Sequence, residues 1–291
     1  MKKIYLFVLC LLIAANTLAQ KNKRPPRYNK KNNENEQFLQ KQWWLGFKAG
    51  TNLSQVVVDK SYTVLQPIVT NAPISGKNYK SFNRFGTQAA LEITFSYKQL
   101  SVSVQPTYRH ASFEYSNQYE WTDPANPTNL LVANYNQEQK VDHAEIPLLV
   151  KYEFGNNKLR PYLQLGAFAA FLVNANKSVT ISRTDYASGA KNEINDPAII
   201  VGATDLFAKN YWGLVGGAGL NYHLGNVRFN FDVMYKRGMS NITSTKNRYS
   251  NDRLSGVGDA LDDMKLNNIS ISLGVLFPLR FLGSGFKSID K

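Results

Sequence analysis

Three histidines are the residues in this chain best suited to acid–base chemistry. His143 is followed two positions later by Glu145, so both side chains fall on one face of an extended strand. His110 has a serine and a glutamate within four positions, and His223 stands apart from the other two. Nucleophilic hydrolysis needs a hydroxyl beside a base that a carboxylate orients. No spacing places a hydroxyl against either of the first two histidines, so we predict no catalytic site.

A cluster of aspartates could supply oxygen ligands to calcium. The segment GDALDDMK contains Asp259, Asp262 and Asp263. Counted from Asp259, Met264 occupies the position where a twelve-residue calcium loop requires glycine, and Ser270 the position of its distal glutamate. We therefore predict solvated loop acids, with no metal site and no cofactor.

Other charged residues interrupt apolar segments at alternate positions. Residues 143–154, HAEIPLLVKYEF, have a period of two, which is typical of a strand rather than a helix. We expect the continuous apolar face to meet lipid and the charged face to point inward, where an ion-paired network has a structural role. An ion or proton path through the same groups is the alternative. The predicted network comprises Lys48, Glu92, Arg109, Glu145, Lys151, Arg228, Asp232 and Lys236.

About eight segments show this alternation, and they must position the charges. Three connections between them are only a few residues long, whereas the others, near 57–83, 118–132, 174–208 and 241–263, are long and polar. Outer-membrane barrels have this asymmetry of short periplasmic turns and long extracellular loops. The prediction is an all-β, membrane-embedded, up-and-down antiparallel barrel. Its strands are expected near 43–56, 84–98, 99–117, 143–154, 160–173, 209–224, 226–240 and 264–280.

The N-terminal residues read as export and spacer segments. Two lysines, an apolar run and Thr17-Leu18-Ala19 predict a signal peptide over 1–19, which contains the only cysteine. Residues 20–42 hold seven lysines and arginines against two glutamates, and we expect a basic, disordered periplasmic arm before a barrel over 43–291. The formal net charge of +13 is concentrated in these segments without a recognition motif, so nucleic acid is not an expected partner.

The strand pair around 143–173 also resembles a known family. The segments AEIPLLVKYEF, RPYLQLGAFAAFL and LGFKAGTNLS are similar to those of the PorT-like outer-membrane β-barrels of Bacteroidota. The resemblance implies a bacterial outer-membrane protein, and the founding members of that family are associated with type IX protein secretion.

These observations predict a non-enzymatic envelope component that acts through binding or assembly. Its expected partners are outer-membrane lipid and proteins of secretion or envelope assembly. A porin-like pore for small solutes and an outer-membrane hydrolase are the competing functions. A soluble, lipocalin-like barrel is the competing fold.

Overall fold

The computed structural model describes residues 41–63, 76–126, 128–155, 157–187, 190–224, 227–250 and 259–279. All of these belong to one compact unit, Leu39–Lys291. The expected signal peptide and nearly all of the expected basic arm lie outside the described residues. No helix among the described residues has the length and apolar character needed to cross a membrane.

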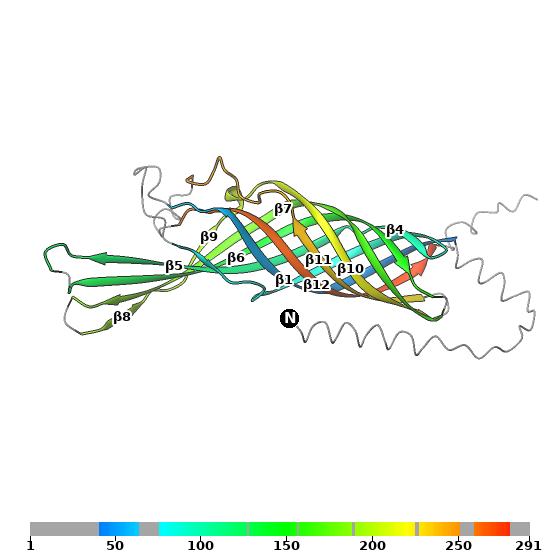
Figure 1. Cartoon of the computed structure of the whole chain (residues 1–291), viewed down its shortest axis with the longest axis horizontal. Coiled ribbons are helices and arrows are strands. Elements are labelled where there is room, and N and C mark those ends of the chain that lie inside the picture. Colours follow the sequence, from blue (N-terminus) through cyan, green and yellow to red (C-terminus); the bar gives the residue numbers. More distant parts are fainter. Residues whose placement is uncertain are drawn as a thin grey trace, which may run out of the picture. The chain divides into compact units, whose positions relative to one another are not determined.

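The strands form one sheet that closes on itself (Figure 1). The ring follows chain order through β1, β3, the pair β4 and β5, β6, β7, β10, β11 and β12, and the antiparallel pairing of β12 with β1 closes it. Counting β4 and β5 as one interrupted strand gives eight, so the prediction of an eight-stranded antiparallel barrel is confirmed. The ring strands are β1 (Lys41–Lys60), β3 (Phe85–Tyr97), β4 (Leu100–Val104), β5 (Thr107–Thr122), β6 (Leu130–Glu153), β7 (Leu159–Asp185), β10 (Asn210–Leu224), β11 (Val227–Gly238) and β12 (Asp263–Pro278).

Proline explains the interruption that the sequence pattern did not predict. Pro106 separates β4 from β5 because it has no backbone N–H to donate to a neighbouring strand. The adjoining Gln105 N–H still donates to the Pro147 carbonyl at 3.1 Å. At the short-turn end, Lys98 and Gly155 have φ values of 55° and 77°, as tight hairpin turns often require.

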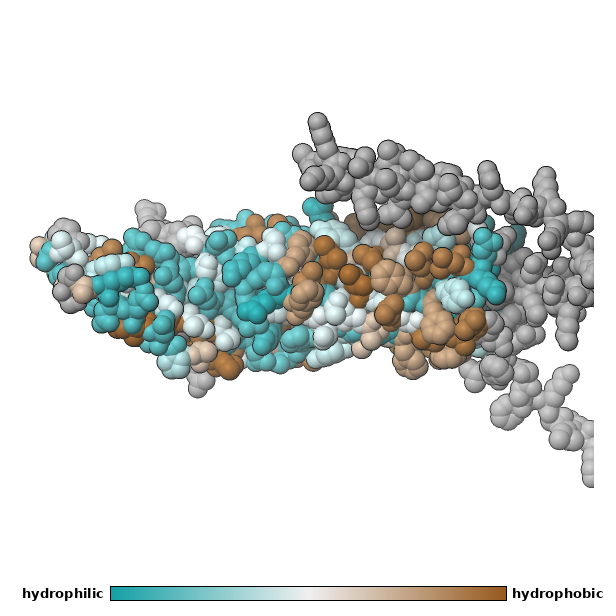
Figure 2. All heavy atoms as spheres, turned by 90° about the horizontal axis from the view of Figure 1, so that it is seen from below, coloured by the Kyte–Doolittle hydropathy of each residue, from teal (hydrophilic) through white to brown (hydrophobic). Residues whose placement is uncertain are grey.

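The outward face of the ring is an apolar belt (Figure 2). Leu165 is 70% exposed, and Leu273 is 67% exposed. Exposed aromatic side chains lie near both ends of the belt, as in the girdles of membrane barrels. They are Trp43, Tyr97, Tyr152, Phe154, Tyr222 and Phe277 toward the short turns, and Phe85, Tyr108, Phe171, Trp212 and Tyr235 toward the other end.

Three strands continue well beyond this belt. β5, β6 and β7 extend through parts of the second and third regions expected to be long loops, and they build a sheet that projects from the ring (Figure 1). The short strands β8 (Asn192–Asn195) and β9 (Ile199–Gly202) add to it along β7, and β2 (Asn78–Tyr79) pairs with β5. We call the part made by β5 and β6 from 117 to 135, with β7 from 181 and β8, the projecting sheet.

The belt predicts how the barrel responds to a buried charge. Leu165→Arg is expected to destabilise the barrel in a bilayer by about 2–4 kcal/mol, because Leu165 lies midway along the apolar part of β7. Thr180→Arg, on the exposed outer face of the same strand beyond the belt, is the matched control. Urea unfolding from lipid vesicles measures both, and equal stability of the two variants would contradict the lipid assignment.

Candidate functional site

A buried ionic network crosses the middle of the lumen. The Glu92 carboxylate lies 2.5 Å from Lys48 Nζ and 2.5 Å from Lys151 Nζ. Lys48 also pairs with Asp232, and the Tyr162 hydroxyl donates a hydrogen bond to the same aspartate. The four charged side chains are at most 4% exposed, and their charges alternate in sign. Each buried charge therefore has an opposite charge beside it, which is the condition for tolerating charge in an interior.

A second cluster lies nearer the extended end. The Glu145 carboxylate lies 2.9 Å from Arg109 and 2.5 Å from Lys236. Both cations therefore share this one carboxylate as their ion-pair partner among the described residues. Tyr211 accepts from Arg109 and packs edge-on against His143, with ring centroids 5.1 Å apart. Glu145 is thus held between two cations and does not orient the histidine as a catalytic carboxylate would.

A third cluster fills the short-turn end. Arg228 donates to Glu153 at 3.1 Å, and its guanidinium lies 4.2 Å from the centre of the Trp44 ring. Asn221 donates to the same carboxylate at 2.8 Å. Trp44 is fully buried, so a large aromatic side chain and a stacked guanidinium occupy the lumen at this level.

All eight charged residues proposed from the sequence are buried, and each has an opposite charge within 3.1 Å. The predicted network did not include the polar side chains that complete the clusters. They carry no charge to break an apolar pattern, so only their parity could have placed them inward. They are Tyr162, Gln164, Asn221, Asn230 and Tyr211.

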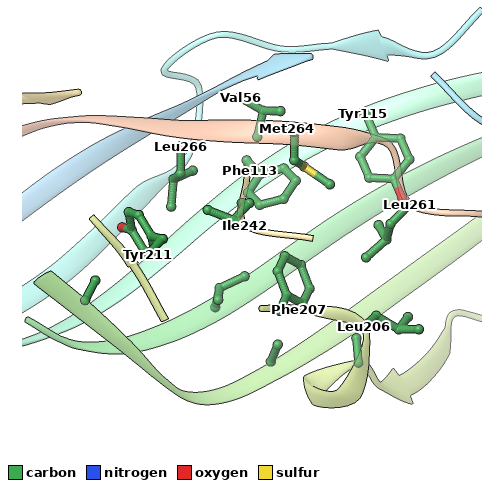
Figure 3. Close-up of a cluster of buried hydrophobic side chains, with 14 of the residues drawn as sticks. Val56, Phe113, Tyr115, Leu206, Phe207, Tyr211, Ile242, Leu261, Met264 and Leu266 are labelled. Atoms are coloured by element: carbon green, nitrogen blue, oxygen red, sulfur yellow. The ribbon is translucent and has the colours of Figure 1, made fainter. Parts of the chain in front are cut away.

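An apolar layer lies beyond the ionic clusters (Figure 3). Phe113 of β5 and Met264 of β12 meet Phe207, Ile242 and Leu261, which come from the connections between strands. The Ile242 N–H donates to the Met264 carbonyl at 2.9 Å, and Ala208 N–H donates to the Ile242 carbonyl at 2.8 Å. Parts of the expected third and fourth loops therefore fold into the barrel and contribute to its core.

A buried ion pair fastens the outer end of this layer. Lys177 pairs with Asp259, and Tyr115 donates to the same carboxylate at 2.7 Å. Lys77 lies 2.9 Å from Asp262, and 3.4 Å from Asp259. We call these five residues the outer latch, because they join the segments before β2 and before β12 to the walls of the barrel.

The latch shifts the titration of its own groups. Burial raises the pKa of Asp259, but the two lysines outweigh it and hold the pKa at about 2. Burial is the largest influence on Lys177 and lowers its pKa, and the neighbouring Lys77 lowers it further. Asp259 and Asp262 raise the pKa of Lys177 and offset this only in part. Asp259 is therefore a carboxylate at neutral pH, and its pair with Lys177 recovers only part of the cost of burying the lysine.

The loop aspartates do not remain solvated as expected. Asp259 and Asp262 are buried in the latch, whereas Asp263 pairs with Arg248. No group of three metal-ligating side chains occurs in the described part of the chain. The acids of this segment tie it to the barrel through cations, a use that the sequence spacing alone did not predict.

The remaining histidines occupy unrelated places. His110 lies on the outer face, where its Nδ1 is 2.5 Å from Asp142. His223 lies near the short-turn end, edge-on to Trp44 with ring centroids 6.1 Å apart. Neither of these contacts brings a serine or threonine hydroxyl to the histidine.

The projecting sheet has faces of different character. Its inward face carries Tyr119 and Trp121, whose rings stack with centroids 5.8 Å apart, and Tyr135, which lies edge-on to Tyr119. Arg183 and Asp196 form an ion pair at 2.6 Å on the same face. Trp121 is 49% exposed, an unusual position for a large aromatic side chain outside the apolar belt.

Several solved structures resemble the chain at low identity. They include Neisserial surface protein A, with 11% identity, 80% of this chain and 96% of that chain covered, and a TM-score of 0.32. AlkL in lipid bilayers has 13% identity, 89% and 96% coverage and a TM-score of 0.36. The attachment invasion locus protein of Yersinia pestis has 13% identity, 81% and 99% coverage and a TM-score of 0.29. No curated protein sequence matches the chain.

A family profile settles the assignment that the apolar belt and the closed strand ring suggest. The family described as "Outer membrane protein beta-barrel domain" matches residues 18–244, which is most of the chain. The protein lies in the bacterial outer membrane, and it belongs to this family of outer-membrane β-barrel domains.

Proposed function

We propose that the protein is a closed, non-enzymatic barrel that serves the cell envelope as a binding or assembly component. The observation that carries this proposal is the occupied lumen. Trp44, Tyr162, Arg109, Lys236 and Tyr115 are all at most 1% exposed, and they come from different levels of the barrel. An eight-stranded barrel is only wide enough for side chains to fill.

Closure of the lumen moves the functional surface to the ends of the barrel. In the described part of the chain, the projecting sheet lies outside the apolar belt, and it carries exposed aromatic side chains that a solvated spacer would not need. A stable membrane anchor with an exposed sheet fits a binding component better than a route for solutes.

The resemblance to PorT-like barrels suggests where to look for the partner. Type IX secretion and the assembly of the Bacteroidota envelope are the processes that it implies. A small-solute pore and a hydrolase are the competing functions. A pore requires a continuous path past the three ionic clusters, and a hydrolase requires a nucleophile beside His143 or His110.

Affinity purification from native membranes in mild detergent tests the binding role. We expect stoichiometric envelope proteins to accompany the full-length chain. They should be lost when residues 118–134 are replaced by a two-residue turn, because this shortens the hairpin at Asn117 and Tyr135, which pair directly. A chain that purifies alone, or one whose partners survive the shortening, would contradict the proposal.

A further inference from the structure

Among the described residues, the outer part of β5 forms an edge of the sheet. Its residues 117–122 pair with β6 on one side. On the other side β3 reaches only to His110 and β2 only to Ser116, and no other described strand pairs there. Such an edge presents backbone donors and acceptors that another strand can use.

Backbone geometry identifies the groups that face the open side. The Lys80 N–H donates to the Glu114 carbonyl, and the Leu91 N–H donates to that of Pro106, so even-numbered residues of β5 point away from β6. Because this direction alternates along an antiparallel strand, Gln118, Glu120 and Thr122 direct their N–H and C=O groups to the open side.

The side chains along this edge also favour a particular partner. Tyr119 and Trp121 lie on the inward face, whereas Gln118 and Glu120 lie on the outward face and hydrogen-bond to each other at 2.7 Å. The segment contains no lysine and no proline, the residues that commonly protect an edge from added strands. On the opposite edge, Glu193 of β8 forms an ion pair with Lys191, which directly precedes that strand.

We propose that the edge of β5 from Asn117 to Thr122 binds an extended segment of another protein by antiparallel strand addition. Apolar side chains of that segment lie beside Tyr119 and Trp121, and polar side chains lie on the outward face, with a basic residue opposite Glu120. This inference rests on the proposed binding role and names the chemistry of the partner.

Strand addition accounts for the observations better than docking of a second copy. Two copies in one membrane are related by an axis along the membrane normal, and β5 rises outward in both of them. Their β5 edges therefore cannot run antiparallel. A strand from a separate polypeptide has no such constraint, and main-chain hydrogen bonds supply its affinity while alternate side chains supply specificity.

The probe is a capped ten-residue peptide that alternates valine and threonine, with one central threonine replaced by lysine. Fluorescence anisotropy measures its binding to the full chain in lipid nanodiscs. Glu120→Pro is expected to weaken binding by about tenfold or more, because it removes one N–H on the open side and places the proline ring against the added peptide strand. Its N–H is not used by β6, so the β5–β6 pairing is retained and edge proline is tolerated.

Glu193→Pro is the matched control, because it places the same substitution on the opposite edge. The Asp196 N–H donates to the Ile181 carbonyl, so the backbone N–H and C=O groups of odd-numbered β7 residues point toward β8. Ile194 lies opposite Arg183 and therefore points its own backbone groups toward β7. The next residue, Glu193, points its N–H away from β7. We expect less than about a twofold change for this variant. Glu120→Gln separates the loss of charge from the loss of the backbone donor.

Peptide methylation tests the register. N-methylation at the threonine and lysine positions is expected to abolish binding, since these residues oppose Gln118 and Glu120 and make the hydrogen bonds. N-methylation at the valines should be tolerated because their N–H groups point away. Equal effects of the two methylation patterns, or of Glu120→Pro and Glu193→Pro, would overturn the proposal.

Other occupants give different results, each of which overturns strand addition by another protein. Dimerisation that Glu120→Pro abolishes would assign the edge to a second copy. Cross-links from position 120 to residues 64–75 would assign it to the chain itself, and displacement of the peptide by lipopolysaccharide would assign the face to a saccharide. Partners that still co-purify with the Glu120→Pro variant would contradict binding at the β5 edge while leaving the proposed binding role intact.

Discussion

Glu145→Ala is expected to lower the free energy of unfolding by about 3–5 kcal/mol. The Glu145 carboxylate serves both Arg109 and Lys236, which are at most 1% exposed. Removal of the carboxylate leaves two cations together in a dry interior without an anion. Urea unfolding from lipid vesicles measures the loss.

Apolar replacement separates a structural network from a conducting one. A triple variant with Arg109, Glu145 and Lys236 all replaced by leucine or methionine is expected to recover most of the stability, because apolar packing often equals a buried ion pair. Glu145→Gln should fall between the alanine variant and the wild type. A Glu145→Ala protein as stable as the wild type would show that the cations reach water, and the lumen would then not be closed.

Asp259→Ala is expected to detach the outer latch at a cost of about 3–5 kcal/mol, since Lys177 is left buried without its carboxylate. Asp263→Ala is the matched control, because it removes a neighbouring acid that pairs instead with Arg248. The Asp263 side chain is 19% exposed, so Asp263→Ala should lower the free energy of unfolding by less than Asp259→Ala does. The rate of protease cleavage near residue 259 measures this detachment directly.

The same carboxylate gives the latch a pH dependence. The pKa of Asp259 is about 2 in the folded protein and near its ordinary value of 3.8 when unfolded. A depressed carboxyl pKa contributes stability that is fully present above the unfolded value and is lost as pH falls through the folded value. Stability should therefore decline between about pH 4 and pH 2 in the wild type and decline less in Asp259→Ala. Parallel curves for the two proteins would contradict the ion pair.

The period-two pattern of apolar residues predicted most strands of the ring. Residues such as Lys48, Glu92 and Glu145 stand out because each interrupts an apolar strand on the face opposite the belt. Their partners did not emerge from the pattern, because Lys48 and Asp232 are 184 positions apart and come together only through ring closure. Strand parity can assign a face, but the pairing order and register decide which side chains meet.

The projecting sheet was hidden for a different reason. Residues such as Asn117 and Gln137 point inward yet are polar, so the contrast between faces that marks β5 and β6 at the membrane fades beyond it. The outer latch had no local signal either, because Lys177 and Asp259 lie 82 positions apart in regions expected to be loops. The outer latch therefore depends on a pairing between distant segments that composition does not encode.

A lumen that side chains close should not conduct ions, and single-channel recording tests this closure most directly. The full-length protein, refolded and inserted into planar lipid bilayers, is expected to give no resolved current steps at moderate salt and voltage. Because an absence of current means something only if the protein has inserted, protection of the barrel from protease must be shown in the same preparation. Reproducible unit steps that change with substitutions at Trp44 or Tyr162 would show an open path and contradict the account.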